Sequence, residues 1–423
     1  MAKTVRIGLM GLGTVGSGLV SLIERNAPII ERRSDVKLEI ARALVKGANK
    51  KRPLPEDKVT LNPRDIFDDP SIDIVVEVIG GIEPARTYLL EALKAKKNIV
   101  TANKAVLAAH GDEILALAGA NECQVGFEAS VCGGIPIIQA LSSGLIANRV
   151  DELIGILNGT SNYILTRMSE EECTFDFVLS EAQEKGLAEA DPSFDVQGID
   201  AAHKLLILAE LTFQVKAQMN EITVEGIDRI TPVDIKTAHD FGFVIKPIAI
   251  AVRDGDNMDL RVHPALLPKL HPLASVHHEF NAVLVKGDAI GEMIFYGKGA
   301  GSLPTASAVL SDIVEIARSD YVVPVWNPQK SIKFAPIESK SRYYLRFPIY
   351  DKPGMIGKIA TVLGDHGISI THAMALLECN ETNKGNVMIV THASKEQDIR
   401  HALADIQKAG TLTETPLAIR MLE

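Results

Sequence analysis

The sequence is poor in the features of secreted, membrane-spanning and metal-binding proteins. Its 423 residues include only four cysteines, Cys123, Cys132, Cys173 and Cys379, and no two of them form a C-x-x-C pair. This spacing predicts reduced thiols rather than a disulfide framework or a zinc site. No apolar run approaches the roughly 18–20 residues that span a bilayer, and the N-terminus reads as a strand rather than a signal peptide. We therefore expect a cytoplasmic protein.

Positive charge is also scarce. The chain carries 44 Lys and Arg against 54 Asp and Glu, which gives a formal net charge of −10. Neither nucleic acid nor an anionic membrane is therefore expected as a partner. The hydrophobic fraction of 46% is ordinary for a globular protein. The length predicts two or three domains.

A glycine-rich turn follows the first predicted strand. Residues 4–10 are mostly apolar, and Gly11, Gly13 and Gly16 then form a G-x-G-x-x-G pattern at the start of helical sequence. Such glycines allow a tight turn, a close backbone approach to a pyrophosphate and tight helix–strand packing. The alternative is a purely structural turn. Because strands and helices go on alternating, we expect a Rossmann domain of the α/β class over 1–130.

Two lysines lie where a dinucleotide would bind such a sheet. The second strand, 36–45, has no Asp or Glu at its end to bind a ribose hydroxyl, and Lys46 follows it. A basic residue there can pair with a 2′-phosphate, so NADP is the predicted cofactor and use of NAD stays open. The alternative is a solvated lysine cluster that includes Lys50 and Lys51. Lys104 is expected at the carboxyl end of strand 98–104, the edge at which parallel sheets bind ligands.

Beyond residue 130 the sequence shows a different order of predicted strands and helices. Over 131–325 most strands lack a following helix, which predicts an α+β substrate and dimerisation domain with a largely antiparallel sheet. Its open face favours a homodimer or homotetramer. A helix at about 303–319 is expected to pack back on the first domain. A linker at 326–342 precedes a βαββαβ unit over 343–423, which fits a ferredoxin-like fold.

An unusual acidic stretch covers 187–204. Its charged residues are Glu189, Asp191, Asp195, Asp200 and Lys204. Asp200 and Lys204 are four residues apart and share a helix face. We expect Ser193 to cap this helix and the helix to run to about Thr212. One interpretation is helix capping plus a surface ion pair. The other is a pocket that binds a substrate ammonium through its carboxylates and places Lys204 for proton transfer.

The chain closely resembles the homoserine dehydrogenase family, in its bacterial monofunctional form with a C-terminal ACT domain. The resemblance covers the whole length and rests on EAQEKGLAEADPSFDVQGIDAAHK, TANKAVLA, FEASVCGGIPI, NGTSNYIL, GKGAGSLPTASAVLSDI and DKPGMIGKIATVLGDHGISI. It implies NAD(P)-dependent interconversion of L-homoserine and L-aspartate 4-semialdehyde, a step toward threonine, methionine and isoleucine. An ACT unit binds amino acids, and the logic of the pathway points to L-threonine as a feedback inhibitor.

The same resemblance implies roles for single residues. Lys204 is implied as the acid/base, Lys104 as a second lysine beside nicotinamide and substrate, and Glu189 as a substrate ligand. Asp195 and Asp200 would support the substrate amino group and the orientation of Lys204. For the cofactor, the resemblance adds Leu12, Thr14, Val15, Lys104, Gly186 and Gly301 to the positions already expected, Gly11, Gly13, Gly16 and Lys46. A sodium ion is implied at the Glu128 carboxylate and the backbone oxygens of Val131, Gly133 and Ile135, an oxygen-only set that suits a hard cation.

The chemistry leaves two rivals. An aldehyde reduction needs a proton at oxygen, which a lysine can supply, and two converging lysines are expected to lower each other's pKa. Cys132 could instead act as a nucleophile, as in aspartate-semialdehyde dehydrogenase. The chain could also be a non-catalytic amino-acid sensor in which the ACT unit does the work. An NADPH-consumption assay separates an enzyme from a sensor.

Overall fold

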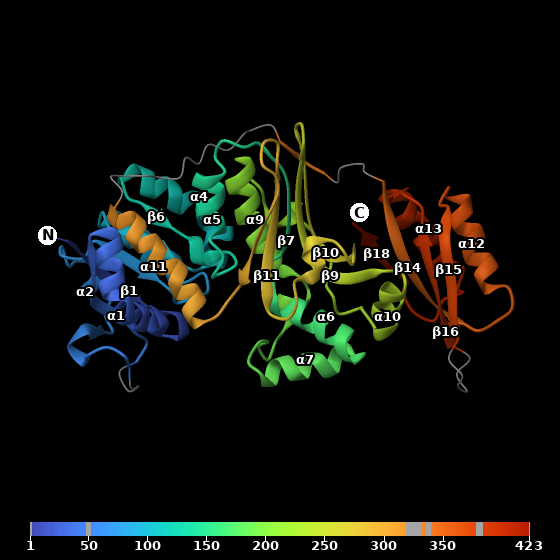
Figure 1. Ribbon diagram of the computed structural model, residues 1–423, viewed down its shortest axis with the longest axis horizontal. Helices are drawn as coiled ribbons and strands as arrows, with labels where there is room; N and C mark the ends of the chain where they lie inside the picture. The colour runs from blue at the N-terminus through green and yellow to red at the C-terminus, as the bar shows by residue number, and fades with distance from the viewer. Residues whose placement is uncertain (1, 48–51, 319–331, 336–339, 378–383, 423) are drawn as a thin grey trace.

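The computed structural model describes residues 2–47, 52–318, 332–335, 340–377 and 384–422. Figure 1 shows three lobes in a row, with the N-terminus at one end and the C-terminus between the second and third lobes. Three residues of the sequence predictions, Lys50, Lys51 and Cys379, lie outside the described residues, as does most of 326–342.

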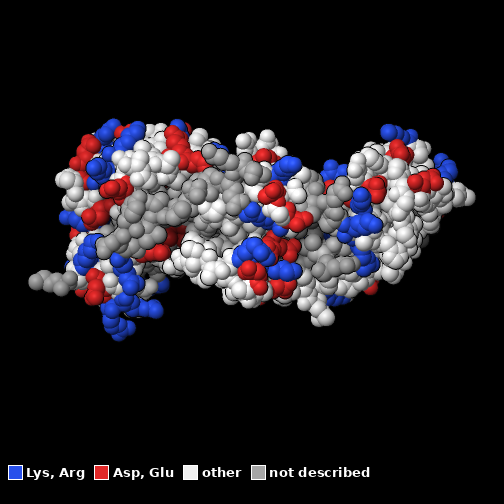
Figure 2. All heavy atoms as spheres, turned by 90° about the horizontal axis from the view of Figure 1, so that it is seen from above, with Lys and Arg blue, Asp and Glu red and all other residues white. Residues whose placement is uncertain are grey.

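The visible surface is of mixed charge, and none of the described helices combines the length with the apolar composition of a membrane span. On the face in Figure 2, acidic and basic side chains are interspersed. Within the described ranges, no helix is both long and apolar enough to cross a membrane.

The first lobe is the predicted Rossmann fold. Its parallel sheet has the strand order β3-β2-β1-β4-β5-β6, so the order reverses between β1 and β4. Ligands of such sheets bind outside the carboxyl ends of the strands at this switch point. The strands are β1 Lys3–Met10, β2 Val36–Leu44, β3 Val59–Thr60, β4 Ile74–Glu77, β5 Asn98–Thr101 and β6 Val125–Gly126. The helices are α1 Thr14–Ser34, α2 Arg64–Phe67, α3 Ala85–Lys94 and α4 Lys104–Ala120.

The second lobe contains the predicted antiparallel sheet, in which β7 pairs with β9 and β11, β9 with β10, and β11 with β12. Strand β8 of this lobe is short: only Thr223 and Val224 pair with β10, and Gly226 then lies against the backbone of Val196. The strands are β7 Val150–Ile156, β8 Thr223–Val224, β9 Phe243–Asp254, β10 Asn257–Pro268, β11 Phe280–Gly287 and β12 Gly291–Lys298. The helices are α5 Ile137–Gln139, α6 Gly159–Glu171, α7 Phe175–Glu184, α8 Ser193–Val196, α9 Ile199–Phe213 and α10 Pro232–Asp240.

Helix α11, Ser302–Arg318, crosses back to the first lobe and lies beside α1 (Figure 1). Its Val309 and Ile313 share a buried core with Leu19 of α1. The two helices approach closely because Gly18 has no side chain, and a Cβ there would collide with Ser302. This packing brings the segment before α11 to the start of α1.

The third lobe has the predicted βαββαβ order, and its first strand begins at Lys340, before the expected residue 343. Its strands pair antiparallel in the order β18-β14-β16-β15. The elements of this lobe are β14 Lys340–Tyr350, α12 Met355–Asp365, β15 Ile370–Leu377, β16 Lys384–Thr391, β17 Ser394–Lys395, α13 Glu396–Lys408 and β18 Leu417–Met421. The short strand β13, Lys333–Phe334, precedes them and pairs with β10 of the second lobe.

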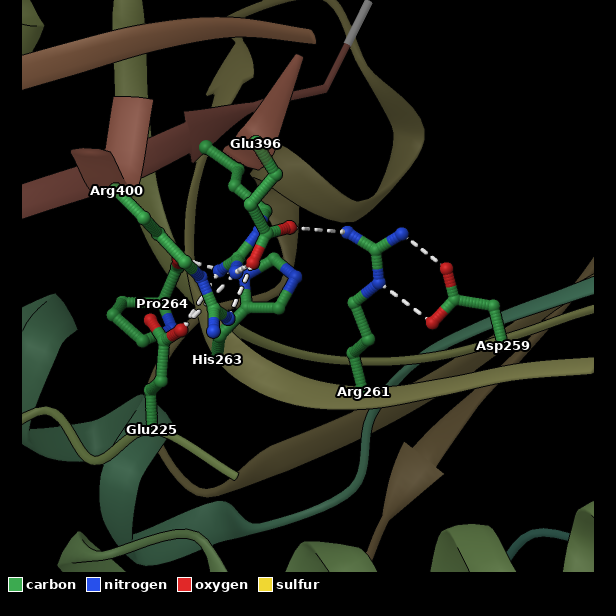
Figure 3. Close-up of polar contacts among 8 residues, drawn as sticks. Glu225, Asp259, Arg261, His263, Pro264, Glu396 and Arg400 are labelled. Carbon is green, nitrogen blue, oxygen red and sulfur yellow. Dashed lines mark hydrogen bonds and ion pairs between the residues drawn. The ribbon is translucent and has the colours of Figure 1, made fainter. Parts of the chain in front are cut away.

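The second and third lobes share one continuous sheet, which the sequence did not predict. Strand β18 pairs in parallel with β10, with Ala265 opposite Arg420. A network of ion pairs reinforces this joint (Figure 3). Arg420 lies 2.8 Å from Glu396 and 3.1 Å from Glu225, and Arg261 lies 3.3 Å from Glu396. The third lobe is therefore joined to the second by both backbone and side chains.

Candidate active site

The glycine turn after β1 has the geometry of a dinucleotide site. Gly11 has φ +105°, and a Cβ on Gly16 would collide with the Gly11 carbonyl, so both positions require glycine. Gly13 instead faces open space, and α1 begins at Thr14 without a side-chain cap. The first amides of α1 are thus open to an anion, as pyrophosphate binding requires. The turn fits a dinucleotide.

Thr14 and Gly301, two of the other expected cofactor positions, lie together at this turn. The Ser302 hydroxyl donates a 2.8 Å hydrogen bond to the Thr14 carbonyl, which places the neighbouring Gly301, with φ +125°, beside α1. Leu12 and Val15 pack against the core beneath the turn.

The remaining expected cofactor positions lie apart from the turn. Lys46 is exposed just after β2. Gly186 ends α7 with φ +71° and donates to Gln183. Among the described residues, Gly186 makes no hydrogen bond to the glycine turn.

A buried carboxylate joins the two lysines. Asp200 Oδ1 lies 2.9 Å from Lys104 Nζ, and Asp200 Oδ2 lies 2.7 Å from Lys204 Nζ. Asp200 is 3% exposed and Lys204 is 8% exposed, so this is no surface ion pair. Lys104 is the first residue of α4 rather than the end of β5, because Asn103 caps the helix by accepting from the Val106 amide. The structure thus brings together residues from two distant parts of the chain.

The acidic stretch forms two helices rather than one. Ser193 begins the short helix α8 and bonds to Asp191 rather than capping a long helix. Gly198, with φ +83°, separates α8 from α9, which ends at Phe213. A Cβ at Gly198 would lie 3.0 Å from Val262 and 3.2 Å from Val224. This break sets the start of α9, and Asp200 lies in its first turn.

The expectation that two lysines would lower each other's pKa is wrong for Lys204. Burial alone would lower the pKa of Lys204, but the adjacent Asp200 carboxylate outweighs burial and raises it. Burial likewise disfavours ionised Asp200, but Lys204 and Lys104 together hold its pKa well below the usual range. Lys204 is therefore a protonated, hydrogen-bonded cation, which suits a proton donor.

The end of β7 supplies further partners that sequence reasoning missed. The Leu157 carbonyl accepts a 2.7 Å hydrogen bond from Lys204 Nζ. The Asn158 amide donates to both Asp195 (2.7 Å) and Asp200 (2.8 Å), while its oxygen caps α6. The pKa of Asp195 is raised by burial, which the Asn158 hydrogen bond only partly offsets. These residues belong to the block NGTSNYIL, whose spacing alone indicates none of these contacts.

Glu189 stands apart from this cluster. Its side chain is exposed in the loop after α7, and its backbone carbonyl accepts from the Gln183 side chain at 3.1 Å. Phe194 lies beside the cluster, with its ring centre 5.8 Å from Lys104 Nζ. The Glu189 side chain is thus open to solvent.

The expected cation turn is ordered by its own hydrogen bonds. The two oxygens of buried Glu128 accept 2.8 Å bonds from the Ile138 and Gln139 amides, and the Ile135 carbonyl accepts from Ile137. Burial raises the pKa of Glu128 despite these bonds. Each carboxylate oxygen keeps a second lone pair, so the donor set still suits a hard cation.

Cys132 lacks the surroundings of a nucleophile. It is buried, and burial raises the pKa of its thiol. Asn281 Nδ2 lies 3.5 Å from the Cys132 sulfur. A nucleophilic cysteine needs an accessible thiolate, so this site does not support the cysteine-based rival.

Three segments of the chain match known families. Residues 11–128 match the NAD-binding domain of homoserine dehydrogenase, 136–314 match homoserine dehydrogenase, and 343–411 match the ACT domain.

Full-length relatives carry the same name. The chain is 44% identical to homoserine dehydrogenase of Synechocystis sp., over 99% of this chain and all of that protein. A crystal structure of a homoserine dehydrogenase from Thiobacillus denitrificans is 41% identical, covers 100% of this chain and 99% of its own, and has a TM-score of 0.89. A hyperthermophilic archaeal homoserine dehydrogenase in complex with NADPH is 26% identical, with a TM-score of 0.64 over 74% of this chain and 98% of its own. This chain, with its dinucleotide-binding and ACT domains, belongs to the homoserine dehydrogenases, a family of oxidoreductases.

Proposed function

We propose that the chain catalyses the NAD(P)-dependent interconversion of L-homoserine and L-aspartate 4-semialdehyde, on the route to threonine, methionine and isoleucine. The observation that carries this proposal is the buried cluster in which Asp200 joins Lys104 and Lys204. When bound at the glycine turn, the nicotinamide cofactor supplies or accepts the hydride.

The residues of the chain move the proton. In aldehyde reduction, the Lys204 ammonium donates a proton to the carbonyl oxygen as it becomes a hydroxyl, and ionised Asp200 holds the ammonium in place. In alcohol oxidation, neutral Lys204 takes the hydroxyl proton. Lys104 adds a second positive charge that stabilises the developing alkoxide.

The remaining carboxylates bind the substrate ammonium in this proposal. Asp200 is already paired with two lysines, so Asp195 and the exposed Glu189 are better placed for that role. A carboxylate near the lysine pair would also favour an amino-acid substrate over a simple alcohol, because only the amino acid carries an ammonium group.

NADP is the cofactor we propose, with NAD as the alternative. No acidic residue ends β2, and Lys46 is exposed just beyond that strand. The archaeal relative in complex with NADPH supports the same choice. We further propose that sodium binds Glu128 and the backbone oxygens of Val131, Gly133 and Ile135, where it would compensate the buried charge of Glu128.

The ACT unit is proposed to bind L-threonine as a feedback inhibitor, in a homodimer or homotetramer. Inhibition requires that threonine bind two states of the enzyme with different affinity. The unit is joined to the second lobe through β10 and β18, which gives a route for such a shift.

Steady-state kinetics with L-homoserine and either NADP or NAD test the proposal. We expect homoserine-dependent NADPH formation and a lower KM for NADP than for NAD. A Lys46→Ala variant should lose part of the NADP preference and leave NAD kinetics unchanged. A chain that turns over neither cofactor with homoserine would instead support the amino-acid sensor.

A further inference from the structure

We infer that Asn281, which no sequence motif singled out, is a positioning residue for Lys204. This inference rests on the proposed role of Lys204 in proton transfer. Asn281 lies near the start of β11 and is fully buried. Its Nδ2 donates a 2.8 Å hydrogen bond to the Leu157 carbonyl, the same oxygen that accepts from Lys204.

The shared carbonyl fixes the direction of proton donation. A lysine ammonium has three N–H groups, and the bonds to Asp200 and Leu157 use two of them. Because the ammonium is tetrahedral, fixing two N–H directions also fixes the third, which is the one left for substrate oxygen. Leu157 follows the end of β7, and Asn281 is the side chain that holds its carbonyl in place.

A second observation concerns the amide oxygen of Asn281. Among the described residues, its Oδ1 is buried without a hydrogen-bond partner. Such an atom costs about 1–3 kcal/mol, so its presence calls for an explanation, of which a functional role is one. A fold that only needed to fill this space could use an apolar side chain of similar size.

The neighbours of Asn281 connect the lysine to the rest of the site. A Cβ on Gly299 would fall on the Asn281 amide group, so the Gly299 backbone packs directly against it. Gly299 leads into Gly301 and Ser302, which meet the glycine turn. Nδ2 also lies 3.5 Å from Cys132 in the expected cation turn. Asn281 thus contacts the segments proposed to bind cofactor and cation as well as the acceptor of Lys204.

The test compares Asn281→Ala with Asn386→Ala. Asn386 lies on β16 of the ACT unit and also has a buried Oδ1 without a partner among the described residues, so it matches the chemistry but not the place. We expect Asn281→Ala to lower kcat by about 10–100-fold, with KM for homoserine and cofactor little changed. The solvent deuterium isotope effect on kcat should rise, because proton transfer becomes slower. Asn386→Ala should change neither.

Loss of folded protein alone would lower the apparent kcat without changing the isotope effect. Each kcat is therefore calculated per enzyme molecule that binds cofactor. If the alanine variant does not fold, Asn281→Ser leaves a smaller cavity and takes its place. An unchanged kcat, or a change confined to KM, would overturn the inference. Lys204→Ala is measured in parallel. If Lys204→Ala keeps its turnover, the proposed mechanism itself is wrong. If Lys204→Ala loses its turnover but Asn281→Ala keeps it, only the role of Asn281 is rejected.

Discussion

At the scale of single residues, the central feature is that one carboxylate pairs with two lysines. Asp200 is almost fully buried and contacts both Lys104 and Lys204. Removing one member of such a group leaves a buried charge without compensation, which typically costs 3–5 kcal/mol. The arrangement also keeps Lys204 protonated, because the carboxylate outweighs the effect of burial on its pKa.

This pairing predicts the pH dependence of the reaction. Since the folded-state pKa of Lys204 is raised, its protonated form persists through neutral into alkaline pH. The kcat for homoserine oxidation should therefore rise with pH toward a plateau above the ordinary lysine range, and kcat for aldehyde reduction should fall over the same range. In Asp200→Asn the carboxylate that raises the pKa of Lys204 is lost. Both pH profiles of kcat should therefore move to lower pH by about one unit or more, where one unit corresponds to about 1.4 kcal/mol.

The matched control for this experiment is Asp191→Asn, an exposed carboxylate in the same acidic stretch. It should leave the pH profile of kcat in place. An Asp200→Asn profile that coincides with the wild-type profile would mean that Lys204 is not the titrating group.

At the scale of elements, the site depends on where helices begin. Lys104 opens α4, and Asp200 lies in the first turn of α9. Gly198 sets the start of α9 by adopting a left-handed backbone between α8 and α9. It packs against Val262 of β10 and Val224 of β8, so the sheet of the second lobe locates Asp200.

We predict that Gly198→Ala lowers kcat by at least about tenfold, because a Cβ must push α9 away from β10 and displace Asp200. Gly242→Ala is the control: its φ of +84° matches the +83° of Gly198, but a Cβ there meets nothing within 4 Å. Both variants should lose about 1 kcal/mol or more of stability from backbone strain, measured by denaturant unfolding. Equal kcat values for the two variants would show that the start of α9 does not control the site.

Much of this organisation could be read from the sequence, and the failures have physical causes. The Rossmann order and the βαββαβ unit follow from strong hydrophobic periodicity and glycine signals. The split between α8 and α9 did not, because Gly198 within helical sequence is compatible with a continuous helix until its φ is known. The lysine–aspartate cluster was foreseen as an i,i+4 pair, but Lys104 and Leu157 reach Asp200 and Lys204 only through tertiary contacts. Single-sequence patterns carry no such pairings.

At the scale of the whole molecule, the ACT unit is an extension of the central sheet rather than a tethered module. The parallel contact of β10 with β18 joins residues far apart in the sequence, so no local pattern could indicate it. Glu225, which follows β8, pairs with Arg420, and its backbone carbonyl lies beside Gly198. A chain of contacts thus links the ACT unit, through Glu225, to Gly198, which lies two residues before Asp200.

We predict that Glu396→Gln weakens this joint. Burial alone would raise the pKa of Glu396, but Arg420, with Arg400 and Arg261, holds it at about 2. Because the folded-state pKa is depressed below its usual value near 4.3, this stabilisation is present above that pH and is lost as pH falls toward 2. The wild type should therefore lose thermal stability over that acid range, and Glu396→Gln should lose less.

The same variant should need a higher L-threonine concentration for half-inhibition at neutral pH, with uninhibited kcat unchanged. Glu414→Gln, at an exposed carboxylate outside the network, serves as the control. Identical acid unfolding and identical threonine sensitivity in wild type and Glu396→Gln would rule out a role for this network in stability and coupling.

The most direct test of the account is the turnover of Lys204→Ala, in both reaction directions, with Lys269→Ala as an exposed-lysine control. General acid–base groups typically contribute about 10²–10⁴-fold. We predict a loss of kcat of at least about 10²-fold for Lys204→Ala, with cofactor still bound and with Lys269→Ala unaffected. Turnover of Lys204→Ala close to that of the wild type would contradict the assignment of Lys204 as the group that transfers the proton.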